Sequence, residues 1–296
     1  MSYRMLAALL MLAGMCTVPV AATPVVLVTV TPAALAQGGA VVVTLRGPAP
    51  DGTLRVRFAS RSWPVYQISD RWQTYLGTDP NTFAGLRPLV VELVQPEETL
   101  VLAHRSVTVR PVTFPRRHIT FTPGTAALLD AKLAGEEQAK LAAALQVLEA
   151  APLWTGSFLV PVIGPITSGY GVFSFYQGIA QGWHHGVDIA APEGQVVSAA
   201  NAGIVRLAEM LPLSGITVVV DHGMGILTYY MHMSAVDVVP GQRVSKGDLV
   251  GRVGSTGLAT GPHLHWGVRV NGIYVDPLRW PPDVEVNRGK IPGPGS

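Results

Sequence analysis

The residues of this chain best suited to chemistry are histidines gathered in three short stretches. Five of the eight histidines and one aspartate fall in these stretches. In the first, residues 183–188, His184 and Asp188 form an H-x-x-x-D pair, and Gly186 between them allows both side chains to turn toward one point. A histidine and an aspartate four residues apart also occur by chance in many chains, so this pair alone is a weak signal.

The second stretch, residues 261–267, reads Gly-Pro-His-Leu-His-Trp-Gly. Alternate residues of a β-strand project from the same face, so His263 and His265 point together while Leu264 turns to the opposite side. The third stretch, residues 229–233, places His232 at the expected end of another strand. Taken alone, His232 is better explained as a packed histidine than as a catalytic one.

Zinc is the metal that this residue set favours, because catalytic zinc sites use three imidazole or carboxylate ligands and leave a fourth position for water. His184, Asp188 and one member of the pair His263/His265 would supply the ligands, and the other member would stay metal-free. A bound zinc ion brings the pKa of its water to about 7 and polarises a substrate carbonyl. An imidazole beside the metal, such as that of His232, could hydrogen-bond the attacking water or the developing oxyanion.

The ordered set of motifs closely resembles the lysostaphin/LytM-type zinc endopeptidases, a family of bacterial peptidoglycan hydrolases. The resemblance covers about residues 154–281. It rests on the three histidine stretches and on three further motifs: Val-Asp-Ile-Ala-Ala-Pro at 187–192, Gly-Gln-Arg-Val at 241–244 and Thr-Gly-Leu-Ala-Thr-Gly at 256–261. Such enzymes cut peptide bonds in cell-wall cross-links or stem peptides, in a groove over a small antiparallel sheet.

Carried over residue by residue, the resemblance implies one Zn²⁺ per chain, bound by His184, Asp188 and His265. It makes His232 and His263 metal-free catalytic histidines. We expect His263 to be the general base and His232 to orient water and stabilise the tetrahedral intermediate, although these two roles could be exchanged.

One stretch departs from the family pattern. Many relatives carry arginines and an Asn-Gly before the first ligand, whereas residues 171–178 here read Gly-Val-Phe-Ser-Phe-Tyr-Gln-Gly. Substrate anchoring is therefore expected to differ. Tyr176 is expected in the groove wall or core rather than among the catalytic residues. His185 is expected to point away from the metal, and His222, in a glycine turn, is expected to be structural.

Two other readings compete with a zinc endopeptidase. The first is an inactive family member that binds peptidoglycan or activates another hydrolase, but such proteins typically lose metal ligands, and all five key positions are present here. The second comes from residues 242–251, which resemble a lipoyl- or biotin-carrier hairpin with Lys246 as the modified residue. That reading leaves the histidines and Asp188 unexplained.

Two β-rich regions, separated by a linker, must position the site. Short runs with period-two alternation between Pro24 and about Arg110 predict an immunoglobulin-like β-sandwich over residues 23–115, in which His104 is a surface or strand histidine. Runs that begin at residues 196, 203, 216, 226, 244, 249 and 263 predict a second, antiparallel sheet, the zinc peptidase domain of residues 154–281. The chain is thus expected to be mostly β.

Between these regions, residues 116–153 are expected to form a short helical linker. Leucines at helical spacing within residues 124–150 predict one or two helices, and Gly135 is expected to interrupt them. Glu136 and Glu137 would then lie in the first turn of the second helix. A helix packed on either domain is the simpler interpretation, and a lid over the neighbouring site is the alternative.

Composition and the two ends of the chain restrict the class of protein and the place where it acts. With 296 residues, a formal net charge of +2 and 48% hydrophobic residues, the chain is expected to fold as two domains and not to bind nucleic acid. The tail, residues 282–296, is polar and turn-rich, and we expect it to be flexible.

Residues 1–22 read as a secretory signal peptide, with Arg4 before an apolar run and cleavage after Ala22. A retained membrane anchor and a lipid attached to Cys16 are the alternatives. After cleavage no membrane span is expected, and the mature protein would lie in the cell envelope or outside the cell. Cleavage also removes the single cysteine, so no disulfide can form.

Overall fold

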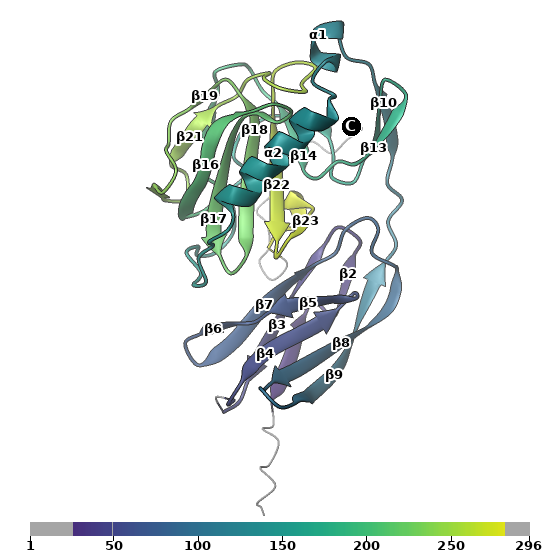
Figure 1. The fold of residues 1–296 in the computed structure, drawn as a ribbon, viewed down its shortest axis with the longest axis vertical. Helices are drawn as coiled ribbons and strands as arrows, with labels where there is room; N and C mark the ends of the chain where they lie inside the picture. The colour runs from purple at the N-terminus through teal and green to yellow at the C-terminus, as the bar shows by residue number, and fades with distance from the viewer. Residues whose placement is uncertain (1–25, 49, 282–296) are drawn as a thin grey trace, which may run out of the picture.

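The computed structural model describes residues 26–48 and 50–281. The expected signal peptide, residues 1–22, and the expected tail, residues 282–296, lie outside the described residues. Strands make up most of the described chain and fall into two groups, with a short helical segment between them in the sequence (Figure 1). The prediction of a mostly β chain with a C-terminal antiparallel sheet is confirmed.

Two sheets form the N-terminal group. One has the strand order β1-β3-β7-β6 and the other β2-β9-β8-β4-β5. Alternation places Leu54, Val56 and Phe58 of β4 in the core between the sheets and leaves polar side chains outside. His104 lies exposed on β9. The strands are β1 (Leu27–Thr31), β2 (Ala34–Ala36), β3 (Ala40–Arg46), β4 (Thr53–Phe58), β5 (Arg61–Pro64), β6 (Tyr66–Ile68), β7 (Arg71–Gly77), β8 (Gly85–Val94) and β9 (Thr99–Arg110).

The C-terminal group is built on one antiparallel sheet with the order β11-β14-β22-β18-β17-β16-β20, and β23 pairs with the last residues of β22. The predicted strand over residues 263–270 is β22, with the same bounds. The strands are β11 (Ile166–Ser168), β14 (Val187–Ala190), β16 (Gly203–Leu211), β17 (Gly215–Gly223), β18 (Ile226–Met233), β20 (Arg243–Val244), β22 (His263–Val270) and β23 (Ile273–Val275).

Smaller elements complete this half of the molecule. Two three-stranded sheets accompany the main sheet. One has the strand order β15-β21-β19, and the other has the order β10-β12-β13. A 3-10 turn, η1 (Pro277–Arg279), follows β23. The strands are β10 (Arg116–Ile119), β12 (Phe173–Tyr176), β13 (Ile179–Trp183), β15 (Val196–Ser198), β19 (Ala235–Val236) and β21 (Leu249–Arg252).

The linker differs from its prediction in two ways. Helices α1 (Pro123–Ala126) and α2 (Ala131–Ala144) form as expected, but α2 runs through Gly135 without a break. A glycine inside a helix costs only about 1 kcal/mol, and the contacts of Glu137 and Leu141, both buried, hold the helix on the sheet. The linker is also not purely helical, because β10 pairs in parallel with β12.

The sandwich and the C-terminal sheet share one hydrophobic core. Polar contacts join them as well: the Tyr66 hydroxyl lies 2.9 Å from Asn271 Oδ1, and Asn271 Nδ2 donates to the Tyr75 carbonyl. From β9 the chain runs along the side of the C-terminal group to β10, and α2 then crosses in front of the main sheet (Figure 1). None of the helices in the described part of the chain has the length and apolarity needed to cross a membrane.

Candidate metal centre

The antiparallel pairing of β14 with β22 brings the two motifs of the sequence together. Asp188 lies directly opposite His265 in this register, and His184 precedes β14 in the loop that follows β13. His184 Nε2, Asp188 Oδ1 and His265 Nδ1 form a triangle with sides of 2.9, 2.9 and 3.0 Å. Strand pairing and a short loop therefore converge two imidazoles and one carboxylate on one point.

Gly186 makes this convergence possible by its lack of a side chain rather than by its backbone conformation. A Cβ atom at this position would lie 2.4 Å from the Trp266 carbonyl oxygen and 2.7 Å from His265 Nε2. Both distances are far below ordinary contact, so any larger residue would push β22 and His265 away from the loop that carries His184.

The first histidine is oriented by the loop that follows β11. His184 Nδ1 lies 2.8 Å from the Gly169 carbonyl oxygen and 3.2 Å from Ser168 Oγ. Because a carbonyl only accepts, Nδ1 carries the ring hydrogen in the neutral form, and Nε2 presents its lone pair to the triangle. A hydrogen-bond acceptor on the ring nitrogen that does not face the metal fixes both the tautomer and the ring orientation that a metal ligand needs.

Burial and mutual hydrogen bonding set the charge state of the triangle. Burial by itself would raise the pKa of Asp188, but the imidazoles of His184 and His265, when they carry a proton toward the carboxylate, outweigh burial and lower that pKa below its ordinary value. Burial lowers the pKa of His265. Asp188 is therefore an anion and His265 favours its neutral form, which are the states in which carboxylates and imidazoles bind metals.

Two further histidines border the triangle. His263 precedes His265 by two residues on the same face of β22, and its Nε2 lies 3.9 Å from Asp188 Oδ1. His232 has a positive φ of 62°, and its ring centre is 4.9 Å from that of His263 and 6.1 Å from that of His265. The structure thus brings all five predicted residues into one cluster.

Both bordering histidines have their Nδ1 atoms held by backbone carbonyls. His263 Nδ1 is 2.8 Å from the Gly261 oxygen, and His232 Nδ1 is 2.8 Å from the Thr256 oxygen. Their Nε2 atoms are therefore the unprotonated ones in the neutral rings. Burial, with the neighbouring rings of His263 and His265, lowers the pKa of His232 to about 3, which keeps it neutral at pH 7.

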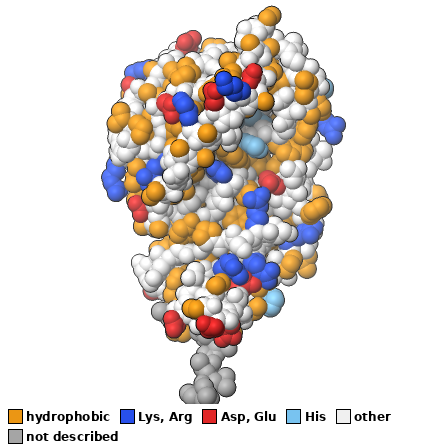
Figure 2. Space-filling view, in the orientation of Figure 1, with side chains coloured by type: hydrophobic (Ala, Val, Ile, Leu, Met, Phe, Trp, Pro, Cys, Tyr) orange, Lys and Arg blue, Asp and Glu red, His pale blue; other side chains and the backbone are white. Residues whose placement is uncertain are grey.

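The cluster lines a groove with a cavity volume of about 430 Å³. Figure 2 shows histidine side chains in a hollow between α2 and the strands β10 and β13. One wall includes Arg117 of β10, and another includes Glu137 and Leu141 of α2. The linker is therefore part of the site rather than a spacer beside it.

Sequence reasoning missed Arg117 and the role of Glu137. Arg117 Nη1 lies 3.6 Å from Asp188 Oδ2. The buried carboxylate of Glu137 accepts hydrogen bonds from the amides of Leu213 and Ser214 and from the Ser214 hydroxyl. Both residues lie more than 70 positions from their partners in the chain, so no local motif marks them.

The remaining candidates lie outside the donor triangle. Tyr176 lines the groove, where its ring meets Phe121 edge to face. His185 stacks on Tyr274 with ring centres 4.6 Å apart. His222 is fully buried in β17, with Nδ1 2.7 Å from the Ala202 carbonyl oxygen.

Comparison with known proteins identifies the domain that holds this cluster. The sequence profile described as peptidase family M23 matches residues 182–277. Peptidoglycan DD-endopeptidase ShyA of Vibrio cholerae is 40% identical over 96 residues, and DD-carboxypeptidase/endopeptidase Mpg of Neisseria meningitidis is 41% identical over 95 residues. Each match covers 32% of this chain and 22% of the relative, so the chain spans less than a quarter of the length of these proteins.

The structural likeness reaches further along the chain. A crystal structure of a candidate M23 peptidase from Pseudomonas aeruginosa is 28% identical, covers 82% of this chain and 92% of its own, and superposes with a TM-score of 0.59. The likeness therefore extends well beyond residues 182–277 and into the N-terminal half. All five clustered residues fall within the matched segment, and the chain accordingly carries a peptidase family M23 domain, the family of the lysostaphin/LytM-type peptidases.

Proposed function

We propose that this protein is an exported zinc endopeptidase that hydrolyses peptide bonds in bacterial peptidoglycan. The observation that carries the proposal is the triangle of His184, Asp188 and His265 donor atoms, 2.9–3.0 Å apart, inside an M23 domain. The relative ShyA, which is named as a peptidoglycan DD-endopeptidase, supports the substrate class, and the relative Mpg, named as a DD-carboxypeptidase/endopeptidase, supports the reaction. The apolar N-terminal run, which reads as a signal peptide, supports export.

The donor set fits a zinc ion. Zinc bonds of about 2.0–2.2 Å at tetrahedral angles separate neighbouring ligand atoms by about 3.3 Å, so the triangle needs to widen by only a few tenths of an ångström. Imidazole and carboxylate ligands suit zinc, and three protein ligands leave a vertex open to water. When bound, zinc supplies a water molecule acidic enough to ionise near pH 7 and a Lewis acid for the scissile carbonyl.

The two bordering histidines supply proton transfer. His263 Nε2 lies 3.9 Å from Asp188 Oδ1 of the triangle and is unprotonated in the neutral ring, so we assign it as the general base that takes the proton of the attacking water. The same nitrogen, once protonated, can deliver that proton to the leaving amine. The bond from Nδ1 to the Gly261 carbonyl holds the ring in place during both transfers.

His232 has a different role at the start of the reaction. Its lowered pKa keeps Nε2 unprotonated, so the ring first acts as an acceptor that orients the water. It can stabilise negative charge on the substrate oxygen only after taking up a proton. The left-handed backbone at His232, with φ of 62°, turns this ring out of the strand and toward His263.

The decisive experiment is digestion of purified sacculi by the full chain, with zinc, with a chelator, and with zinc restored after chelation. We expect new amino termini on the peptides only when zinc is present. Cleavage that ignores the chelator, or no cleavage at any zinc concentration, contradicts the proposal. Binding to sacculi without cleavage would instead support the inactive family member.

A further inference from the structure

Arg117 is the one arginine or lysine among the described residues that line the groove. It enters from β10, outside the segment matched by the M23 profile. The parallel pairing of β10 with β12 sets Arg117 opposite Ser174, and alternation leaves the neighbouring Arg116 exposed. A permanent cation is thus placed at the metal centre by the linker.

The guanidinium is held at one edge and open at the other. Arg117 Nε donates to Ser174 Oγ at 2.9 Å, and Ser174 is buried. A guanidinium has five N–H donors in a rigid fork, and this bond engages only the Nε edge. The Arg117 side chain keeps 27% of its surface exposed, so the fork is positioned and accessible.

The contact with Asp188 does not by itself explain this placement. The distance from Arg117 Nη1 to Asp188 Oδ2 is 3.6 Å, whereas a charge-assisted hydrogen bond spans about 2.7–2.9 Å. Asp188 meets His184 and His265 through Oδ1, at 2.9 and 3.0 Å, so the oxygen that faces Arg117 is not a donor of the triangle. Arg117 therefore lies beside the donor triangle without a hydrogen bond to it.

We propose that Arg117 binds a free carboxylate of the substrate, an inference that rests on the proposed function and names its substrate class. A divalent ion with one carboxylate ligand leaves a charge of about +1 at the centre, and Arg117 adds another. The opposing acid of the groove, Glu137, is committed to the amides of Leu213 and Ser214. An anion entering the groove meets net positive charge beside the scissile bond.

The position of Arg117 also limits where that carboxylate lies in the substrate. Its guanidinium is within 4 Å of an oxygen of Asp188, a member of the donor triangle, and an extended peptide advances about 3.3–3.6 Å per residue. The carboxylate must therefore belong to a residue that flanks the scissile bond. Cross-links that carry an acid at that point fit this requirement, and bridges of glycine, which carry none, do not.

The test uses two synthetic peptides with acyl-D-alanine on the carbonyl side of the scissile bond. They differ only in a free carboxylate or a carboxamide on the carbon that bears the scissile nitrogen. We expect the full, zinc-loaded chain to cleave the acid with a kcat/KM about tenfold to a hundredfold higher, the range for a hydrogen bond between charged groups. In Arg117→Gln this ratio should fall to about one, mainly through KM.

Four controls make the outcome specific. Arg116→Gln, on the exposed face of β10, should keep the wild-type ratio, and Arg117→Lys should keep part of it. Zinc content should be equal in all variants. Binding of a non-cleavable pair, with a methylene in place of the scissile carbonyl, should show the same preference for the acid without any turnover.

Three results would overturn the inference. Equal cleavage of the acid and the amide by the wild type would refute carboxylate recognition while leaving the endopeptidase proposal intact. Loss of zinc in Arg117→Gln with an unchanged ratio would show that Arg117 only positions Asp188. Cleavage of neither peptides nor sacculi by the wild type would defeat the proposed function, and the inference with it.

Discussion

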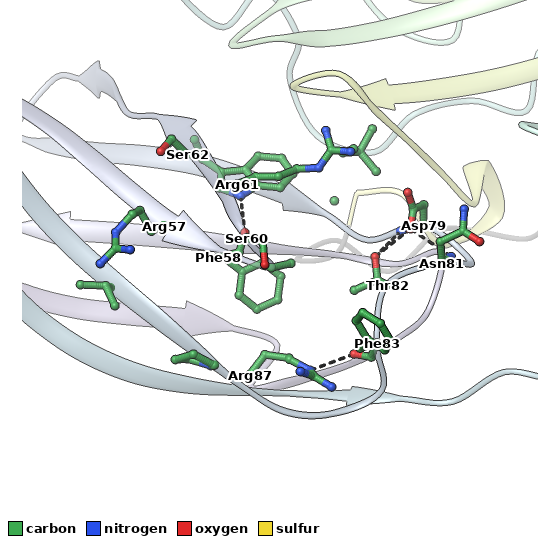
Figure 3. A pocket seen from close by; sticks show the side chains of 16 residues that line it. Arg57, Phe58, Ser60, Arg61, Ser62, Asp79, Asn81, Thr82, Phe83 and Arg87 are labelled. Carbon is green, nitrogen blue, oxygen red and sulfur yellow. Dashed lines mark hydrogen bonds between the residues drawn. The ribbon is translucent and has the colours of Figure 1, made fainter.

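Two cavities of this chain differ in size and in chemistry. The larger, about 610 Å³, lies in the sandwich among Arg57, Arg61 and Arg87, as Figure 3 shows, whereas the histidine groove has about 430 Å³. Two arginines of the larger cavity are bonded within the sandwich. Arg57 pairs with Glu92, and Arg87 donates to the backbone carbonyl of Phe83.

The smaller cavity holds the one cluster of metal-ligating side chains found among the described residues. Its donor atoms face one another at about the spacing of metal ligands, and the outer nitrogen of His184 is held by the Gly169 carbonyl. The comparison teaches that convergence of buried donors, rather than volume, locates the chemistry. One hydrogen bond links the walls of the two cavities, because Trp183 of the groove donates to Asn81 of the sandwich cavity.

Removing a ligand from the groove gives the sharpest contrast. His184→Ala should lose zinc and reduce turnover by about a thousandfold or more, because both the activated water and the preorganised charge are lost. Arg61→Ala, in the sandwich cavity, should leave zinc content unchanged and turnover within about twofold. Metal analysis and initial rates on a soluble peptide measure both. Stoichiometric zinc in His184→Ala would break the assignment.

Within the groove, substitution of a bordering histidine should have a different effect from substitution of a metal ligand. His232→Ala removes a proton acceptor but no ligand, so zinc should stay at one ion per chain while kcat falls by about a hundredfold or more. The measurement is kcat at saturating peptide beside zinc content in the same preparation. Retention of wild-type kcat would remove His232 from the mechanism.

A substitution in the linker should reduce activity less than one in the histidine cluster but more than one in the sandwich cavity. Glu137 holds Ser214, whose carbonyl accepts the backbone N–H of His232 at 2.9 Å. Glu137→Ala should leave the two amides of residues 213 and 214 unsatisfied, lower the free energy of unfolding by about 1–3 kcal/mol and reduce kcat by about tenfold, with zinc retained.

A neighbouring acid provides the control for Glu137. Glu136 lies half exposed on the same helix and only approaches Lys132, at 3.9 Å. Glu136→Ala should therefore change stability by less than about 0.5 kcal/mol and leave kcat unchanged. Urea unfolding and initial rates separate the two variants, and equal behaviour of both would show that α2 is only packed against the sheet.

What the sequence predicted follows local periodicity. The alternation of His263, Leu264 and His265 defines β22 and the shared face of its histidines, and this was confirmed as a strand with the same bounds. The strand register that sets Asp188 opposite His265 has no such local signal. The family resemblance, rather than spacing, selected His265 over His263 as the expected ligand.

What the sequence could not predict depends on contacts distant in the chain. Arg117 reaches Asp188 because β10 pairs with β12, and Glu137 reaches Ser214 because α2 packs across the sheet. The expected break at Gly135 was wrong for the same reason: propensity is local, while the anchor that holds α2 is tertiary. The positive φ of His232 is likewise imposed by its surroundings.

The smallest predicted effect concerns His222, a histidine that is buried but lies outside the cluster. Burial lowers the pKa of His222 to about 4, below the value of about 6.5 in an unfolded chain. Between these values the unfolded state binds more protons, so the stability that neutral His222 provides is complete above about pH 6.5 and is lost as the pH falls toward 4. From about pH 7 to about pH 5 the loss should be about 2 kcal/mol.

A matched pair of variants isolates this contribution. The difference in unfolding free energy between the wild type and His222→Gln should shrink by about 2 kcal/mol on going from about pH 7 to about pH 5, because the variant has no proton to gain at this position. His104→Gln, exposed on β9, should show no such change. A gap between wild type and His222→Gln that stays constant with pH would mean that residue 222 opens to water before the sheet unfolds.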